Sequence, residues 1–171
     1  MALAPAAAAR QAGNPAPPRG VTTEHLRIAT YASREAGAPG AGVSIVFDVS
    51  PRDRMHVYAP GADGYRVITV AWERNPAVVA QPLQYPASEI YFFEPLNERV
   101  PVFQKPFRLT QPLVVGGGPE QRKALAAAGA VTIKGTLEYQ ACDDRVCFSP
   151  ASVPVSYTLR LRPGAAGAEA P

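Results

Sequence analysis

Two cysteines are the residues in this sequence best suited to chemistry. Cys142 and Cys147 are its only cysteines, and four residues separate them. At this spacing they can form a disulfide that closes a ring of about six residues, which the chain-entropy model values at only about 2 kcal/mol. A chain of 171 residues can bury an adequate core without such a link. A structural disulfide stays open as an interpretation, but stability does not require one.

The charges beside the two sulfurs differ. Asp143 and Asp144 follow Cys142 and disfavour its thiolate, whereas Arg145 lies two residues before Cys147 and favours a thiolate there. Thiol–disulfide exchange uses such an asymmetry, because one sulfur meets the partner and the other resolves the mixed disulfide. We therefore expect Cys147 to face the partner and Cys142 to be the resolving cysteine.

Other kinds of site have weaker support. The only imidazoles are His25 and His56, and no serine lies in a GxSxG elbow, so a hydrolase triad is not indicated. CxxC and HxxxH spacings are absent, and we expect no bound metal, although two cysteines and a histidine can bind copper or zinc in other geometries. His56 and Trp72 alternate with apolar neighbours and are expected to be packing residues.

Strands are expected on both sides of the cysteines. Apolar residues occupy the odd positions 131, 133, 137 and 139, and again 153 to 161. This two-residue period is typical of half-buried strands. Further strands are expected at residues 26–30, 43–49, 55–60, 65–72, 78–85 and 107–115, and one short helix from Pro119 to Ala128, with Gly129 as its end. The pattern, with 19 prolines between short apolar runs, predicts an all-β antiparallel sandwich with one short helix at most.

The ends of the chain differ in composition from its middle. Residues 1–20 and 163–171 are rich in Ala, Pro and Gly and are expected to be a disordered leader and tail around a folded domain at 21–162. The start lacks a basic segment and Pro5 breaks its apolar run, so a signal peptide is expected to be absent or removed. The sequence has no run of about 18 apolar residues, so no membrane span is expected. A net charge of +3 with scattered basic residues gives no support for nucleic-acid binding.

The segment at residues 88–109 is the least strand-like apolar region. It combines large apolar side chains with charges and three prolines. Each such side chain left in solvent would forgo about 1.5–3 kcal/mol of burial, so the segment should lie against something. Edge-strand packing and a lid over a neighbouring site are the two interpretations.

The run YQACDDRVCFSP at 139–150, between two expected strands, resembles the amino-terminal periplasmic domain of the thiol:disulfide interchange protein DsbD. MHVYAPG at 55–61 is similar to an early strand end of that family, and residues 85–109 are similar to the segment that includes its cap loop. The resemblance spans about residues 42–161 and suggests a stand-alone form of the domain. It implies an immunoglobulin-like sandwich whose cysteine pair relays electrons in the periplasm without a cofactor.

The resemblance also implies roles for particular residues and partners. Cys142 and Cys147 match the redox pair, with the second cysteine the one that meets partners. Residues 93–98, which include Glu94, match the cap loop. Leu96 stands where the family has the aromatic residue of the cap, so Phe92 or Phe93 would take the place of that aromatic.

The implied partners are thioredoxin-fold proteins, either a disulfide isomerase or a thioredoxin-like donor or acceptor. Because the sequence holds no membrane domain, a membrane electron donor would act in trans, and neither nucleic acid nor a small-molecule substrate is expected. Such a chain would be a thiol–disulfide oxidoreductase relay domain. The rival hypothesis is a non-enzymatic immunoglobulin-like binding module with a structural disulfide.

Overall fold

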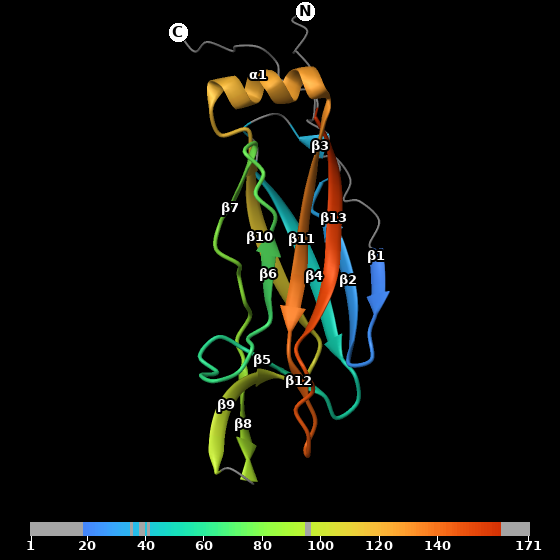
Figure 1. Cartoon of the computed structure of the whole chain (residues 1–171), viewed down its shortest axis with the longest axis vertical. Coiled ribbons are helices and arrows are strands. Elements are labelled where there is room, and N and C mark those ends of the chain that lie inside the picture. Colours follow the sequence, from blue (N-terminus) through green and yellow to red (C-terminus); the bar gives the residue numbers. More distant parts are fainter. Residues whose placement is uncertain (1–18, 35, 38–39, 41, 95–96, 162–171) are drawn as a thin grey trace, which may run out of the picture.

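The structure is a computed structural model that describes residues 19–34, 36–37, 40, 42–94 and 97–161 (Figure 1). These residues form one helix and thirteen strands, so the predicted all-β class is confirmed. The elements in chain order are β1 (Arg19–Thr22), β2 (Leu26–Ala32), β3 (Ala36–Gly37), β4 (Gly42–Pro51), β5 (His56–Tyr58), β6 (Thr69–Trp72), β7 (Val78–Ala80), β8 (Glu89–Phe93), β9 (Glu98–Phe103), β10 (Phe107–Val115), α1 (Pro119–Ala128), β11 (Ala130–Tyr139), β12 (Ala141–Cys142) and β13 (Ala151–Leu161).

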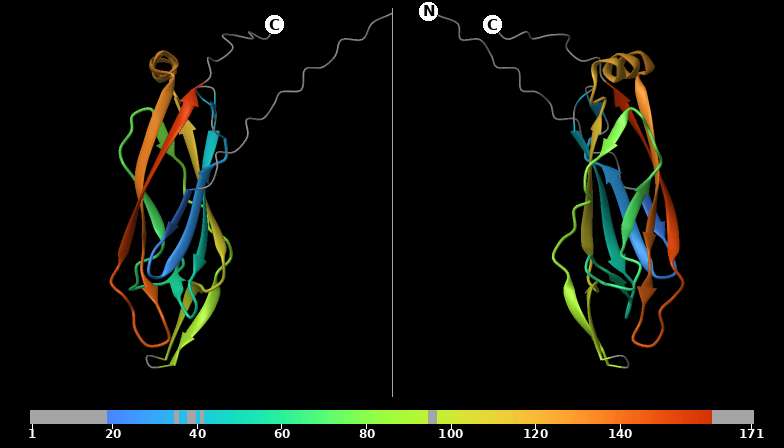
Figure 2. Two further views of the ribbon diagram at one scale, coloured as in Figure 1. Left: turned by 90° about the vertical axis from the view of Figure 1, so that its right-hand side faces the viewer. Right: turned by 60° about the vertical axis from the view of Figure 1, so that its left-hand side comes forward.

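Two of the three sheets form a sandwich. One has the strand order β1-β2-β4-β10-β7 and the other the order β3-β13-β11-β6. All of their pairings are antiparallel except that of β3 with β13. Figure 2 shows the two layers edge on, with the blue and cyan strands of the first sheet facing the orange and red strands of the second. The predicted antiparallel sandwich is therefore confirmed.

The strands on either side of the cysteines form the longest pairing of the second sheet. β11 and β13 pair from Ala130 with Arg160 to Tyr139 with Ala151. Along β13 every odd position from Val153 onward is buried and every even position is exposed. The two-residue period of the sequence thus correctly predicts which face turns inward.

The main core lies between the two sheets. Phe47 and Leu109 from the first sheet and Leu137 from the second are completely buried in it. A polar contact also joins the layers, because the hydroxyl of Tyr157 contacts that of Thr30, which donates a hydrogen bond to a backbone carbonyl of β4. These contacts join the inner faces of the two sheets.

Helix α1 lies across one end of the sandwich (Figure 1). It has the predicted bounds, with Pro119 at its first position. Gly129 ends it in the left-handed conformation, with φ of 68°, and donates a backbone hydrogen bond to Leu125 at 3.1 Å. Among the described residues no helix has the length and apolar character needed to cross a bilayer.

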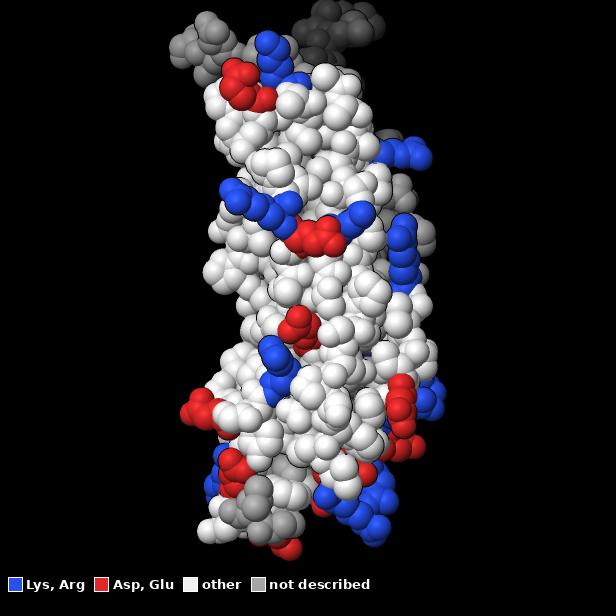
Figure 3. All heavy atoms as spheres, viewed as in Figure 1, with Lys and Arg blue, Asp and Glu red and all other residues white. Residues whose placement is uncertain are grey.

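The third sheet has the order β12-β5-β9-β8 and lies at the opposite end of the molecule from α1 (Figure 1). Here the segment at 88–109 forms a regular hairpin of β8 and β9, so its expected lack of strand character is wrong for most of its length. Three expected strands are shorter than predicted, since 55–60 reduces to β5, 65–72 to β6 and 78–85 to β7. On the face in Figure 3, acidic and basic side chains are interspersed, as their scatter along the sequence suggests.

The described residues include only part of the expected domain boundaries. β1 begins at Arg19 and pairs with β2, two residues ahead of the expected start of the folded domain. The remaining leader residues, 1–18, and the expected tail, 163–171, lie outside the described residues. The division into leader, domain and tail stays a prediction.

Candidate active site

The cysteines lie where the chain passes from the second sheet into the third. β11 ends at Tyr139, and after one residue β12 pairs with β5, which places Cys142 opposite His56. Cys147 forms a bridge back to Cys142 across a tight hairpin, and Phe148 donates a backbone hydrogen bond to Ala141 at 2.9 Å. The cysteine hairpin, residues 142–147, is therefore held at its base by β-type pairing.

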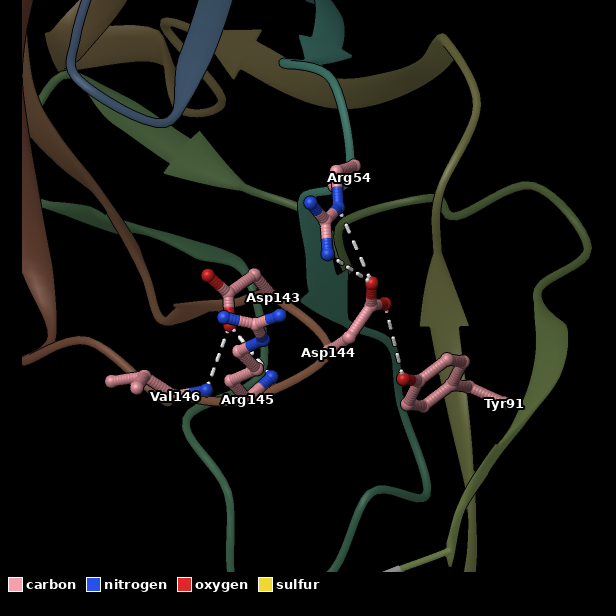
Figure 4. A network of polar contacts seen from close by, with 6 residues as sticks. All are labelled: Arg54, Tyr91, Asp143, Asp144, Arg145 and Val146. Atoms are coloured by element: carbon pink, nitrogen blue, oxygen red, sulfur yellow. Dashed lines mark hydrogen bonds and ion pairs between the residues drawn. The ribbon is translucent and has the colours of Figure 1, made fainter.

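Asp143 orders the tip of the cysteine hairpin. Its carboxylate accepts hydrogen bonds from the backbone N–H groups of Arg145 and Val146, both at 2.7 Å, and its own N–H donates to the Val146 carbonyl at 3.0 Å (Figure 4). The two backbone donors lower the pKa of Asp143 below its usual value. The negative charge of Asp143 thus stabilises the turn at residues 143–146.

The two cysteines form a disulfide, with 4.1 Å between their Cα atoms. Their exposure differs sharply, since Cys142 is 1% exposed and Cys147 is exposed. Cys147 is therefore the cysteine that a molecule approaching from solvent meets, while Cys142 lies inside the protein.

Tyr58 contacts both sulfurs. Its hydroxyl lies 3.0 Å from Sγ of Cys142 and 3.3 Å from Sγ of Cys147. A disulfide carries no hydrogen, so the hydroxyl is the donor. Tyr58 is 2% exposed and its ring stacks on Tyr65 at 4.0 Å between centroids. The Tyr65 hydroxyl in turn donates to the carboxylate of Glu98 on β9 at 2.6 Å.

His56 packs against the aromatic rings beside the disulfide. It is buried, its ring packs 4.5 Å from that of Tyr91, and it meets the ring of Tyr58 edge-on at 5.6 Å. Burial lowers the pKa of His56, against the opposing effect of Asp144 and Asp143. The expectation that His56 is a packing residue agrees with this burial.

Asp144 contacts one side chain in the turn before β5 and one on β8. It pairs with Arg54 at 3.0 Å, and the hydroxyl of Tyr91 lies 3.5 Å from its other oxygen (Figure 4). Together with the backbone contacts of Asp143, this pairing offsets the negative charge near Cys142. The structure therefore makes burial, more than charge, the main difference between the two sulfurs.

Comparison with known proteins identifies the family. The family model for the N-terminal domain of the thiol:disulfide interchange protein DsbD matches residues 28–157. The chain belongs to this family. The predictions of the family, of its immunoglobulin-like sandwich and of a thiol–disulfide interchange module are thereby confirmed, and the paired cysteines agree with them. No curated protein matches the chain.

Solved structures align with the chain at low sequence identity. The N-terminal periplasmic domain of ScsB from Proteus mirabilis aligns with a TM-score of 0.54 and 12% identity, over 82% of this chain. The chain spans 49% of that structure, about half its length. The reduced N-terminal domain of DsbD from Neisseria meningitidis aligns with a TM-score of 0.43 and 16% identity, over 72% of this chain and 86% of that one. The GAE domain of GGA2p from Saccharomyces cerevisiae has a TM-score of 0.43 and 12% identity, over 83% of this chain and 96% of that one.

The residues expected to form the cap of this DsbD-type domain occupy different positions on the β8–β9 hairpin. Phe93 lies on the same face as Tyr91, with 6.5 Å between their rings. Phe92 is on the opposite face, 42% exposed, with the guanidinium of Arg99 5.3 Å from its ring centre. Glu94 is exposed, and Leu96 lies outside the described residues.

Sequence reasoning assigned no individual role to four residues that build this site, namely Tyr58, Tyr65, Tyr91 and Glu98, although the last two lie in the segment that it singled out. The contact of the hairpin with Asp144 is made by Tyr91, not by the phenylalanines. One signal for Tyr58 was present, because it lies in the run MHVYAPG that resembles the family. Among the described residues, no three His, Cys, Asp or Glu side chains converge to hold a metal ion.

The lowered pKa of His56 predicts that stability falls on mild acidification. Between this folded pKa and the ordinary value of 6.5, the unfolded chain binds more protons than the folded one, so the free energy of unfolding decreases as the pH falls below about 6.5. Thermal unfolding between about pH 7.5 and about pH 5 should show a falling Tm, and His56→Phe should flatten that decrease. Asp143 acts in a separate window, because its lowered pKa removes stability only below its ordinary value of 3.8. A His56→Phe variant with the same pH dependence as the wild type would contradict the assignment.

Proposed function

We propose that the chain exchanges disulfides with thioredoxin-fold partners through Cys147 and uses Cys142 as the resolving cysteine. The observation that carries this assignment is the difference in burial, with Cys142 1% exposed and Cys147 exposed in the same disulfide. An attacking thiolate must approach one sulfur in line with the disulfide bond, and access decides which one it reaches.

The exchange then follows from the positions of the sulfurs. When the chain accepts electrons, a partner thiolate attacks Sγ of Cys147, the disulfide breaks, and its electron pair stays on Cys142 as a thiolate. The second thiolate of the partner attacks the partner's own sulfur in the mixed disulfide and releases Cys147 as a thiolate. Both cysteines are then reduced and the partner is oxidised.

Delivery of electrons uses the same sulfurs in reverse. The Cys147 thiolate attacks the disulfide of an oxidised partner and forms the mixed disulfide, while the other partner sulfur leaves as a thiolate. Cys142 then attacks Sγ of Cys147, which re-forms the internal disulfide and releases the reduced partner. No cofactor takes part in either direction.

The β8–β9 hairpin is proposed to shield the pair on the side of Cys142, in line with the cap expected from the sequence. Support comes from the packing of Tyr91 on His56 and of Val100 and Val102 in the same small cluster as Tyr58 and Cys142. Phe93 extends this aromatic surface, whereas Phe92 faces the other side of the hairpin. The cap function is thus assigned to the face of β8 that bears Tyr91 and Phe93.

The compartment and the electron donor are further parts of the proposal. Periplasmic location is supported by family membership and by the ScsB structure, which is described as periplasmic. A membrane protein acting in trans would supply electrons, and disulfide isomerases or other thioredoxin-like proteins would receive them.

The reduction potential of the Cys142–Cys147 disulfide tests the proposal. Exchange-active disulfides have potentials above about −300 mV, because their reduced forms must be reached under physiological conditions, whereas structural ones lie below that value. We expect a potential above this limit when the protein is equilibrated with glutathione or dithiothreitol buffers and the thiols are trapped by alkylation. A disulfide that stays oxidised at every buffer potential above about −300 mV would instead favour the rival, a binding module with a structural disulfide.

A further inference from the structure

The proposed exchange places negative charge on a buried sulfur. Attack at Cys147 leaves the electron pair on Cys142, which is 1% exposed and has two aspartates as its next neighbours in the chain. A thiolate without water is costly unless a hydrogen-bond donor reaches it. Cys147 has no such need, because it is exposed to water.

Tyr58 supplies that donor. Among the residues that the structure describes, its hydroxyl is the one hydrogen-bond donor within reach of Sγ of Cys142, at 3.0 Å. We propose that Tyr58 is a catalytic residue that donates its hydroxyl hydrogen bond to the Cys142 thiolate when the disulfide opens. This inference rests on the proposed function and adds a residue to its chemistry.

The surroundings of Tyr58 hold the hydroxyl in place. Tyr58 lies on β5, whose neighbouring strand β12 carries Cys142, and its ring is fixed by stacking on Tyr65. The Tyr65 hydroxyl donates its own hydrogen to the carboxylate of Glu98 on β9, which holds the stacked pair of rings against the third sheet. Burial, followed by the nearby Tyr65 and Glu98, raises the pKa of Tyr58, which keeps its hydroxyl protonated and able to donate.

The step is balanced without a proton transfer from tyrosine. The partner's sulfur forms a bond to Sγ of Cys147, the bond from Cys147 to Cys142 breaks, and Cys142 keeps the electron pair. The hydroxyl, shared between both sulfurs in the disulfide, then turns its full hydrogen bond to Cys142. A hydrogen bond to a charged group is stronger than one to a neutral sulfur, so the donor favours the open state over the closed one. A more stable thiolate is also a faster leaving group.

The test compares Tyr58→Phe with the wild type in reduction by dithiothreitol. This reagent attacks the exposed sulfur without docking, and the reaction is followed by rapid mixing and alkylation. We expect Tyr58→Phe to be reduced about 10- to 100-fold more slowly, the range expected for loss of one hydrogen bond to a charged group. In the Cys147→Ser background, ultraviolet titration of the Cys142 thiolate should show a higher thiol pKa when Tyr58 is replaced.

A matched control is Tyr157→Phe, which removes a different buried hydroxyl from the main core, where it contacts Thr30. That variant should be reduced at the wild-type rate. Tyr58→Phe reduction at the wild-type rate with an unchanged Cys142 thiol pKa would overturn the inference. If Tyr58→Phe does not fold, the Tyr58 hydroxyl proton is observed by NMR in the Cys147→Ser variant, and a signal that does not shift as Cys142 ionises would equally overturn it.

The outcome separates this inference from the proposed function. A wild-type protein that dithiothreitol cannot reduce under native conditions would count against the exchange function itself. A wild-type protein that is reduced readily, together with a Tyr58→Phe variant of equal rate, would leave the exchange function standing and remove only the role of Tyr58.

Discussion

A Cys142→Ser variant is expected to accumulate a mixed disulfide with a thioredoxin-fold protein, whereas Cys147→Ser is expected to accumulate none. In the first variant the exposed Cys147 remains to react and the resolving sulfur is missing, so the complex persists. In the second variant the remaining sulfur is that of Cys142, which is 1% exposed and out of the partner's reach.

The experiment uses a thioredoxin-fold partner that keeps one cysteine, activated as a mixed disulfide with thionitrobenzoate. Attack by Cys147 releases the coloured thionitrobenzoate and leaves the covalent complex, which is seen on a non-reducing gel and by mass spectrometry. The matched control is Cys147→Ser, whose single thiol should react with the activated partner only after unfolding in denaturant. Complexes formed equally fast by both variants would show that burial does not select the sulfur.

Phe47→Ala is expected to lower the free energy of unfolding by about 3–5 kcal/mol, because it empties the centre of the main core. Phe47 is completely buried on β4, the strand that pairs with both β2 and β10. Urea unfolding followed by circular dichroism measures the loss.

Phe92→Ala is the matched control for this prediction. Its ring is 42% exposed and lies under Arg99, so its removal costs a cation–π contact and limited burial, together about 1 kcal/mol. Equal losses for the two variants would mean that the third sheet contributes as much to stability as the core between the two large sheets. If Phe47→Ala does not fold, the smaller change Phe47→Leu should still destabilise the protein more than Phe92→Ala.

Local patterns in the sequence predict the strands and the helix whose own residues show a regular alternation or a helix-end residue. β13 was predicted because apolar and polar residues alternate over its whole length, and α1 because Pro119 and Gly129 mark its two ends. β12 has only two residues, too few for any period, and exists because Ala141 meets Val57 across the third sheet. Such pairings depend on the tertiary fold, which a local pattern does not encode.

The same limit applies to the site. The cysteine pair was identifiable from spacing and neighbours, and its unequal sulfurs were expected, although for reasons of charge rather than burial. The contact of Tyr58 with Cys142 joins residues 84 positions apart, so no sequence window contains it. Tyr91 was visible as one aromatic among several, but only the pairing of β8 with β9 decides that it turns toward Asp144 while Phe92 turns away.

The residues around the disulfide pack as a cluster of their own. Tyr58, Ala62, Val100, Val102 and Cys142 are buried together, apart from the core between the two large sheets. A small apolar cluster contributes less free energy than a large one, so this end of the molecule can open locally while the sandwich remains folded. The β8–β9 hairpin can therefore move and return many times within the lifetime of a single folded molecule.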